Sequence, residues 1–287
     1  MRYGSVGAFI AGGQGWPAKG PCAVIFAEDA CLLAETIDHH LRLGFAHVLV
    51  LLPEGLVAPE VADAGRVALA TCDTRAPGAV AAILNQLVSA APGAWLYWGH
   101  NAEFLFFPFC DSRSVGELVA FHAEERRSAM MAYVIDLYAG DLATAPDGVS
   151  REGAMLDRSG YYASQRFRDG VALERQMDIF GGLRRRFEEH VPWARRRIDR
   201  VALFRAAKGV QMRADLTLSE EEMNTIACPW HNNLTATVVS FRAAKALRSN
   251  PGSKWAIRDF RWSGSVPFGW SSRELMELGL MEPGQWF

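Results

Sequence analysis

Three polar residues follow directly on an apolar run near the middle of the chain. His100, Asn101 and Glu103 come after Trp95–Trp98, in the sequence HNAEF. An apolar run with aromatic content is typical of a strand that is buried on both faces. An imidazole, an amide and a carboxylate at the end of such a strand could bind a metal ion or a polar ligand. These side chains are therefore the first candidates for a functional site.

Strands and helices alternate on both sides of this point. Buried strands are predicted at Cys22–Ala27, His47–Leu52, Arg66–Cys72 and Trp95–Trp98, and helices between Asp29 and Gly44 and over Ala79–Val88. Such alternation predicts an α/β protein with a layered sheet and right-handed crossovers. Ligands bind at the carboxyl ends of the strands in sheets of this kind. Glu28 follows the first strand as His100 follows the fourth, so both are expected at that edge.

The second half of the chain is less regular. We predict a helix over Val115–Arg127, a strand over Met130–Tyr138 and a long irregular stretch over 139–169, long enough to be a functional loop. A further helix is expected from Asn232 or Asn233 to about Arg248. Ser219 with Glu222 and Ser271 with Glu274 have the spacing of capping boxes. The sequence predicts one domain over 1–250, followed by an irregular, aromatic-rich C-terminal appendage over 251–287 that packs on it.

Composition limits the classes of protein to consider. The chain has 287 residues, half of them apolar, and a net charge of −2, so nothing in the overall charge indicates a nucleic-acid partner. Its five cysteines are widely spaced without a CxxC pair, which favours reduced thiols over disulfides or a zinc site. No apolar run approaches the roughly 18 residues that span a bilayer. We therefore expect a cytoplasmic protein.

Positive charge is concentrated in one part of the chain. Residues 151–210 contain 14 Lys and Arg against 8 Asp and Glu, a local net charge of +6. Arg184–Arg186 and Arg195–Arg197 form its two densest runs. Such a stretch could meet phosphates or lipid headgroups, or could be a solvated helix face.

Several segments, taken in order, carry a resemblance to a known family. They are EDACLLAE at 28–35 with HHLRLG at 39–44, EFL at 103–105, VIDLY at 134–138, FGGLRRRF at 180–187 and PWH at 229–231. Together they resemble the glycosyltransferase family 2-like proteins of the GT-A fold, over roughly residues 20–250. The resemblance implies a Rossmann-like mixed sheet flanked by helices. It also implies transfer of a sugar from a nucleotide-diphosphate sugar to a glycan or lipid-linked acceptor, as in polysaccharide biosynthesis.

The chain departs from the family where the family binds metal. The two aspartates of the D-x-D motif correspond here to His100 and Ala102, and Leu52 stands where an acid would end the second strand. The leaving diphosphate is usually neutralised by Mn²⁺ or Mg²⁺, which prefer carboxylate oxygens. At about 4 Å and an effective dielectric constant of about 20, each lost charge pair is worth about 4 kcal/mol before desolvation.

Three interpretations of this departure stay open. His100, Glu103 and His231 could form an altered metal site, because imidazole suits Mn²⁺ or Zn²⁺. Alternatively the transfer is metal-independent, with Arg184 and Arg186 holding the diphosphate. The resemblance then implies a donor-binding set of Glu28, His100, Asn101, Glu103, Arg184 and Arg186. In the third interpretation the strand-end residues only cap the strand and make structural hydrogen bonds.

A transferase also needs a general base beside the acceptor hydroxyl. Asp136, in the predicted strand Met130–Tyr138, and Asp111, which follows the HNAEF segment, are the candidates. Either could equally be a structural or surface acid.

These observations lead to a main hypothesis and two alternatives. The main hypothesis is a GT-A-type glycosyltransferase that acts on a nucleotide sugar. The first alternative is a catalytically inactive relative that binds a sugar, a nucleotide or a partner protein. The second is a scaffold that contacts the membrane surface through its basic stretch and aromatic tail.

Overall fold

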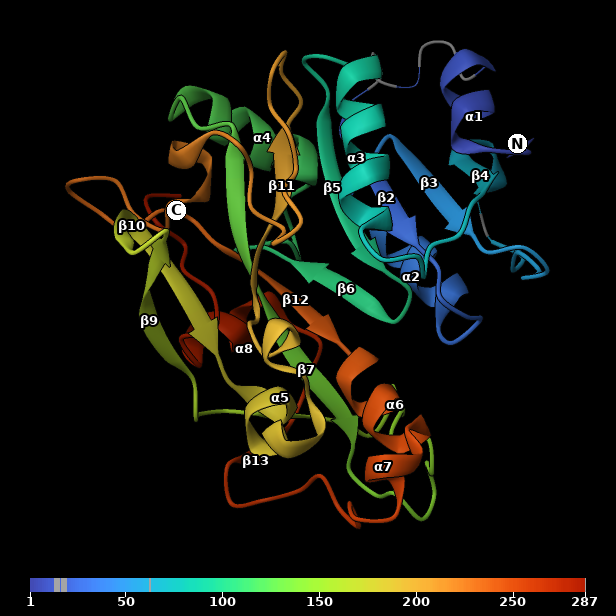
Figure 1. Cartoon of the computed structure of the whole chain (residues 1–287), viewed down its shortest axis with the longest axis vertical. Helices are drawn as coiled ribbons and strands as arrows, with labels where there is room; N and C mark the ends of the chain where they lie inside the picture. Colours follow the sequence, from blue (N-terminus) through green and yellow to red (C-terminus); the bar gives the residue numbers. More distant parts are fainter. Residues whose placement is uncertain (13–15, 17–19, 62, 287) are drawn as a thin grey trace. The chain divides into compact units, whose positions relative to one another are not determined.

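The computed structural model describes residues 1–12, 16, 20–61 and 63–286, which form two compact units (Figure 1). Unit 1 consists of Met1–Phe104, Ser112–Met131 and Val201–Asn224. Unit 2 consists of Leu105–Asp111, Ala132–Arg200 and Thr225–Phe287. Each unit is therefore assembled from three separate stretches of the chain.

Unit 1 is built on a mixed sheet. Its strands are β1 (Arg2–Tyr3), β2 (Cys22–Phe26), β3 (His47–Leu52), β4 (Val67–Thr71), β5 (Trp95–His100) and β11 (Asp199–Arg205), of which the last enters from unit 2. They lie in the order β1-β4-β3-β2-β5-β11. The first five are parallel, and β11 is antiparallel to β5. Every residue of β2 is buried, as its continuous apolar sequence predicts.

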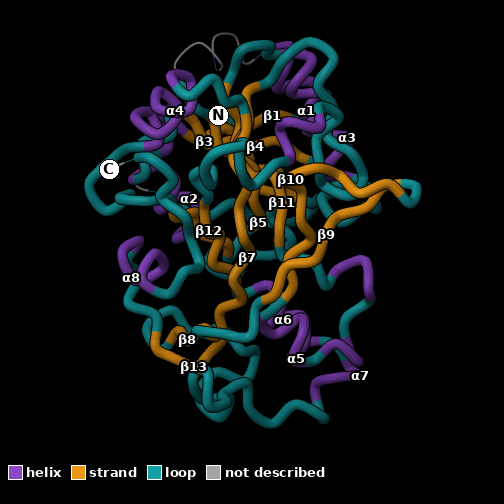
Figure 2. The backbone as a smooth tube through the Cα atoms, turned by 90° about the vertical axis from the view of Figure 1, so that its left-hand side faces the viewer, coloured by secondary structure: helices purple, strands orange, loops and turns teal. Residues whose placement is uncertain are grey.

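Helices cover both faces of this sheet. They are α1 (Val6–Gly12), α2 (Leu33–Arg42), α3 (Ala79–Ala90) and α4 (Val115–Glu124). Figure 2 shows α2 and α4 on one side of the unit 1 strands and α1 and α3 on the other. A capping box starts α4, since the Ser114 hydroxyl accepts from the Glu117 amide and the Glu117 carboxylate accepts from the Ser114 amide.

Unit 2 is centred on β7 (Ala129–Ala139), which starts in unit 1, and on β12 (Ala236–Ser240), which is parallel to it. Its other strands are β8 (Ala154–Asp157), β13 (Ser265–Pro267) and the antiparallel pair β9 (Tyr162–Arg168) and β10 (Val171–Phe180); β6 (Glu103–Phe106) crosses the unit boundary. Its helices are α5 (Gly182–Arg186), α6 (Arg242–Ser249), α7 (Pro251–Lys254) and α8 (Ser272–Glu277). Short 3₁₀ turns occur at Ala64–Arg66, Glu188–His190, Trp193–Arg195 and Glu221–Asn224.

The predicted α/β class, with a mixed sheet flanked by helices, is confirmed. The four strands expected in the first half and the helix over α3 are present. Residues 251–287, expected to be an appendage, belong to unit 2. All five cysteines are free thiols, and burial raises the pKa of Cys22 to about 12. Among the described residues, no helix is both long enough and apolar enough to cross a membrane.

Three local predictions are wrong. The segment expected to be one helix from Asn232 or Asn233 to about Arg248 is helical only in its second half, as α6. It begins instead with β12, because the β-branched run TVV pairs with β7. Ser219 starts no α-helix; its hydroxyl accepts from the Gln211 amide within a loop. The stretch 139–169 contains β8 and β9 rather than being irregular throughout.

Candidate functional site

Asn101 joins the carboxyl ends of β2 and β5. Its side-chain oxygen accepts from the Glu28 amide at 2.8 Å. Its side-chain nitrogen donates to Asp29 Oδ1 at 2.7 Å and to the Cys31 carbonyl at 3.0 Å. Asn101 is fully buried, and Glu28 and Asp29 are half-buried. The two strand ends expected at one edge of the sheet are therefore linked there by a single buried amide.

The loop after β2 is shaped by the same contacts. The helix expected after Asp29 begins only at Leu33. The Asp29 carboxylate instead accepts from the Cys31 amide at 3.0 Å and from Asn101. Leu32, the residue before the helix, has a left-handed φ of 49°. The turn is thus held by side chains at the edge of the sheet and not by a helix cap.

Glu103 points inward. Its side chain is fully buried, and Oε2 accepts from the His100 amide at 2.9 Å and lies 3.4 Å from His100 Nδ1. The His100 ring packs near Phe26 and Trp98, each with a centroid distance of 5.9 Å. These are the structural contacts that the third interpretation of the sequence expects. A carboxylate in this position does not face solvent.

Thr74 and Arg75, in the loop between β4 and α3, complete this edge. The Thr74 hydroxyl donates to the Ala27 carbonyl at 2.5 Å, and the Arg75 guanidinium donates to the Glu28 carbonyl. Thr74 is buried, whereas Arg75 is exposed. The loop after β4 therefore adds a cation to the end of β2. Sequence reasoning missed Arg75, although its position after a predicted strand could have indicated it.

His40 lies in the core of the same unit. It is fully buried, stacks on Tyr97 at 4.8 Å and places Nδ1 2.7 Å from the Thr36 carbonyl. Burial lowers its pKa to about 4, against the smaller opposing effects of the Thr36 carbonyl and of Glu103. The ring is therefore neutral at physiological pH.

The proposed metal ligands do not form a set within either unit. His100 and Glu103 are in contact in unit 1, while His231 belongs to unit 2, where its Nδ1 lies 2.9 Å from the Asn232 carbonyl. No group of three or more His, Cys, Asp or Glu that could hold a metal occurs in the part of the chain that the structure describes. The Glu103 carboxylate is buried and accepts from the His100 amide, so this carboxylate is not presented to an Mn²⁺ or Mg²⁺ ion.

Asp136 is buried in unit 2 against a pair of glycines. Its carboxylate lies 3.3 Å from Arg184 Nε and accepts from the Arg184 amide at 3.3 Å. Burial raises the pKa of this carboxyl, and Arg184 opposes the shift. A Cβ at Gly182, where φ is +63°, would lie 2.9 Å from Asp136 Oδ2, and one at Gly181 would lie 2.1 Å from the Tyr161 ring. The glycines allow this carboxylate and this ring to approach the backbone.

Arg186 belongs to a second buried group around Asp157. The Asp157 carboxylate accepts from Tyr138 Oη at 2.5 Å, from Trp262 Nε1 at 2.7 Å and from Arg186 at 3.1 and 3.2 Å. The Arg186 guanidinium also lies 5.2 Å above the Trp262 ring. Three side chains therefore donate to the Asp157 carboxylate. Sequence reasoning missed it, because it lies in the stretch that was expected to be irregular.

Asp111, the other candidate base, is engaged near a helix start. Its carboxylate accepts from the Ser272 hydroxyl and, at 3.1 Å, from the Ser272 amide at the first residue of α8. Negative charge at this position satisfies helix donors that have no partner within the helix. Asp111 therefore has a structural role in unit 2.

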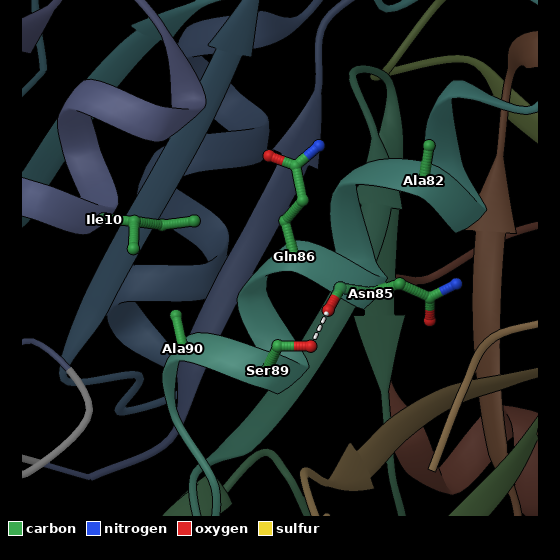
Figure 3. Close-up of a pocket in the computed structure, with 6 residues that line it drawn as sticks. All are labelled: Ile10, Ala82, Asn85, Gln86, Ser89 and Ala90. Carbon is green, nitrogen blue, oxygen red and sulfur yellow. Dashed lines mark hydrogen bonds between the residues drawn. The ribbon is translucent and has the colours of Figure 1, made fainter. Parts of the chain in front are cut away.

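An open depression of about 560 Å³ lies elsewhere in unit 1, between α1 and α3 (Figure 3). It is lined by Ile10, Ala82, Asn85, Gln86, Ser89 and Ala90. None of these residues carries a charge, and the Ser89 hydroxyl donates to the Asn85 carbonyl at 2.8 Å. The lining offers no cation for a diphosphate.

In comparisons with known proteins, the chain matches no family model and no curated protein.

Proposed function

We propose that this chain is a glycosyltransferase-like protein that binds a nucleotide-diphosphate sugar at the carboxyl ends of β2 and β5. It transfers the sugar to a glycan or lipid-linked acceptor in the cytoplasm. The supporting observation is the Asn101 amide, which holds the loops after both strands in one arrangement. Ligands of open α/β sheets bind at such an edge, and a site held by buried contacts needs little ordering when the ligand arrives.

Transfer in this proposal needs no metal bound by side chains. The acid left from the family motif, Glu103, is buried, and Arg184 and Arg186 are paired with Asp136 and Asp157. Arg75 is the cation assigned to the diphosphate, because its guanidinium is exposed at the strand ends. Arginine pairs with phosphate oxygens through two parallel hydrogen bonds.

A second candidate function is favoured by one specific observation. Glu103, the acid left from the family motif, is fully buried and hydrogen-bonded to its own turn. A relative that has lost its metal carboxylates could retain donor binding without turnover. In this second proposal the chain binds a nucleotide sugar and does not transfer it.

Titration with a panel of UDP- and GDP-sugars tests both proposals. Binding is measured by calorimetry and release of UDP or GDP by a coupled assay, each with Mn²⁺ and with EDTA. Release that is equal in Mn²⁺ and EDTA supports metal-independent transfer, and binding without release supports the inactive relative. If no sugar nucleotide of the panel binds and no UDP or GDP is released, both proposals are refuted.

Two arginine variants locate the site. Arg75→Ala should weaken nucleotide-sugar binding at least tenfold, since a charged hydrogen bond contributes about 1.5–3 kcal/mol. Arg273→Ala is the matched control, because Arg273 is an exposed arginine of unit 2 that pairs with Glu277 in the same helix. Equal affinity for both variants would remove Arg75 from the proposal.

A further inference from the structure

The helices α6 and α7 of unit 2, with the segment that follows them, carry a high density of positive charge. Residues 242–262 contain six Lys and Arg against one Asp, a net charge of +5. Figure 1 shows α6 and α7 side by side, and the Arg248 guanidinium in α6 donates to the Lys254 carbonyl in α7 at 2.7 Å. The cations are thus carried by two helices that are joined to each other.

The apolar side of α6 is already covered inside unit 2. Its residues Ala244 and Leu247 are buried in a cluster with Tyr138, Leu183, Ile257 and Phe260. Lys254 and Arg258, by contrast, are exposed. The surface that this segment leaves to solvent is therefore basic.

Carboxylates of the neighbouring segments offset only part of this charge. Arg248 donates to three backbone carbonyls, which carry no charge, so its positive charge is not neutralised by them. Asp259 pairs with Arg261 at 3.3 Å. The loop 140–149, which Arg248 contacts through a carbonyl, contributes two aspartates and leaves a net charge of +3 over the two segments. An attraction for anions consequently remains.

One aromatic ring is exposed among these cations. Trp255, the residue after α7, is 80% exposed, and Lys254 Nζ lies 5.2 Å from its ring centroid. The Trp262 ring is engaged instead, because its Nε1 donates to Asp157 and the Arg186 guanidinium lies above it. An indole has an apolar body and a polar N–H, and such rings are enriched at the boundary between lipid chains and headgroups.

We propose that residues 242–262 form a docking surface for an anionic lipid membrane. Clusters of about four to eight Lys and Arg on an amphipathic helix attract anionic headgroups, and an interfacial Trp adds apolar burial. Trp255 enters the headgroup layer, while Lys254 and Arg258 contact lipid phosphates. Single-stranded nucleic acid is bound by successive stacked rings, whereas this surface offers one. The inference goes beyond the proposed function, since membrane binding requires neither a nucleotide sugar nor its transfer.

Sedimentation with lipid vesicles tests the proposal. The full chain is mixed with vesicles of phosphatidylcholine, or of equal parts phosphatidylcholine and phosphatidylglycerol, and the bound fraction is measured. We expect binding to the mixed vesicles alone, with a shift of tryptophan fluorescence to shorter wavelength. Trp255→Ala should weaken binding about tenfold and abolish the shift. Arg258→Gln should weaken it about fivefold, the contribution of one cation near an anionic surface.

Matched controls come from other parts of unit 2. Trp230 is 84% exposed and the Arg273 side chain is 81% exposed, and both lie outside residues 242–262. Trp230→Ala and Arg273→Gln should bind the mixed vesicles as tightly as the unsubstituted chain. Circular dichroism of each variant checks that it is folded.

Several outcomes would overturn the proposal. They are the absence of binding to both kinds of vesicle, equal binding to both kinds, and equal losses in Trp255→Ala and Trp230→Ala. Binding of a single-stranded oligonucleotide that depends on Trp255, without binding of vesicles, would assign the surface to nucleic acid instead. No nucleotide sugar is present in this assay, so vesicle binding succeeds or fails independently of the proposed transfer.

Discussion

Replacing Asn101 by Asp tests the edge of the sheet most directly. The two side chains have the same shape, and Asp keeps the oxygen that accepts from the Glu28 amide. The Asn101 side-chain nitrogen, which donates to Asp29 Oδ1 at 2.7 Å, is replaced by a second carboxylate oxygen. Two like charges at that distance repel by about 6 kcal/mol at an effective dielectric constant of about 20.

Protonation limits this cost and makes it depend on pH. At pH 7, protonating one carboxyl with an ordinary pKa near 4 costs about 4 kcal/mol, so the loss of stability should be about 4 kcal/mol. The folded protein raises the pKa of that carboxyl, so the lost stability returns as the pH falls toward 4. Asn101→Ala should instead lose about 2–4 kcal/mol at every pH, because it removes three hydrogen bonds and leaves buried groups unpaired.

Urea unfolding of Asn101→Asp and Asn101→Ala between pH 4 and pH 8, followed by circular dichroism, is the assay. Asn85→Asp is the control, because the Asn85 amide exchanges two hydrogen bonds with the Met212 backbone and meets no carboxylate there. The Asn101→Asp midpoint should approach that of the unsubstituted protein at pH 4 and fall well below it at pH 7. If its loss is the same at both pH values, Asn101 does not link the two loops as described.

Three further perturbations have defined outcomes. Gly182→Ala should lose more than 2 kcal/mol of stability in thermal unfolding, because its Cβ would lie 2.9 Å from a buried carboxylate oxygen. Gly170 has open space around it, so Gly170→Ala should lose only the roughly 1 kcal/mol of backbone strain. Equal losses in the two variants would contradict this prediction. Asp157→Asn should lose about 3–5 kcal/mol, since it leaves the Arg186 charge without its partner, and a loss below 1 kcal/mol would show that the pair is not needed. Burial lowers the pKa of His122 in α4 to about 4, so the folded protein loses stability as the pH drops from about 6.5 to 4. In His122→Phe the urea midpoint should depend less on pH over that range, and an unchanged pH dependence would show that His122 is not responsible for it.

The first half of the fold could be predicted from the sequence because its strands carry a strong local signal. The continuous apolar runs of β2 and β3 admit only buried strands, and the glycine at position 44 adopts the left-handed φ of 91° expected after a helix. The edge that they form could also be predicted, since it follows from the parallel order. The arrangement of side chains at this edge could not be predicted, because it depends on a hydrogen bond between the Glu28 amide and the Asn101 side chain. These two residues are 73 positions apart in the sequence.

Prediction was poorer where long-range pairing decides the structure. Asn233 is a plausible start for a helix, and β12 follows it three residues later. Only the pairing of β12 with β7 selects the strand. The buried ion pairs of Arg184 and Arg186 were equally out of reach, because arginines in a row give no indication of which carboxylates they meet. The space that the neighbouring glycines leave is taken by Asp136 and Tyr161.

The interleaving of the two units in the chain has a consequence for biosynthesis. β11 completes the sheet of unit 1 by pairing Arg205 with Trp95, yet all of the unit 2 stretch Ala132–Arg200 is translated between those two residues. A ribosome must therefore release most of β11 before the N-terminal sheet can close, and unit 2 must still wait for residues 225–287. The residues of unit 1 are complete at Asn224, after most of unit 2 has been translated but before residues 225–287. Nascent chains arrested before β11 emerges should consequently leave the edge of β5 exposed and need chaperone protection.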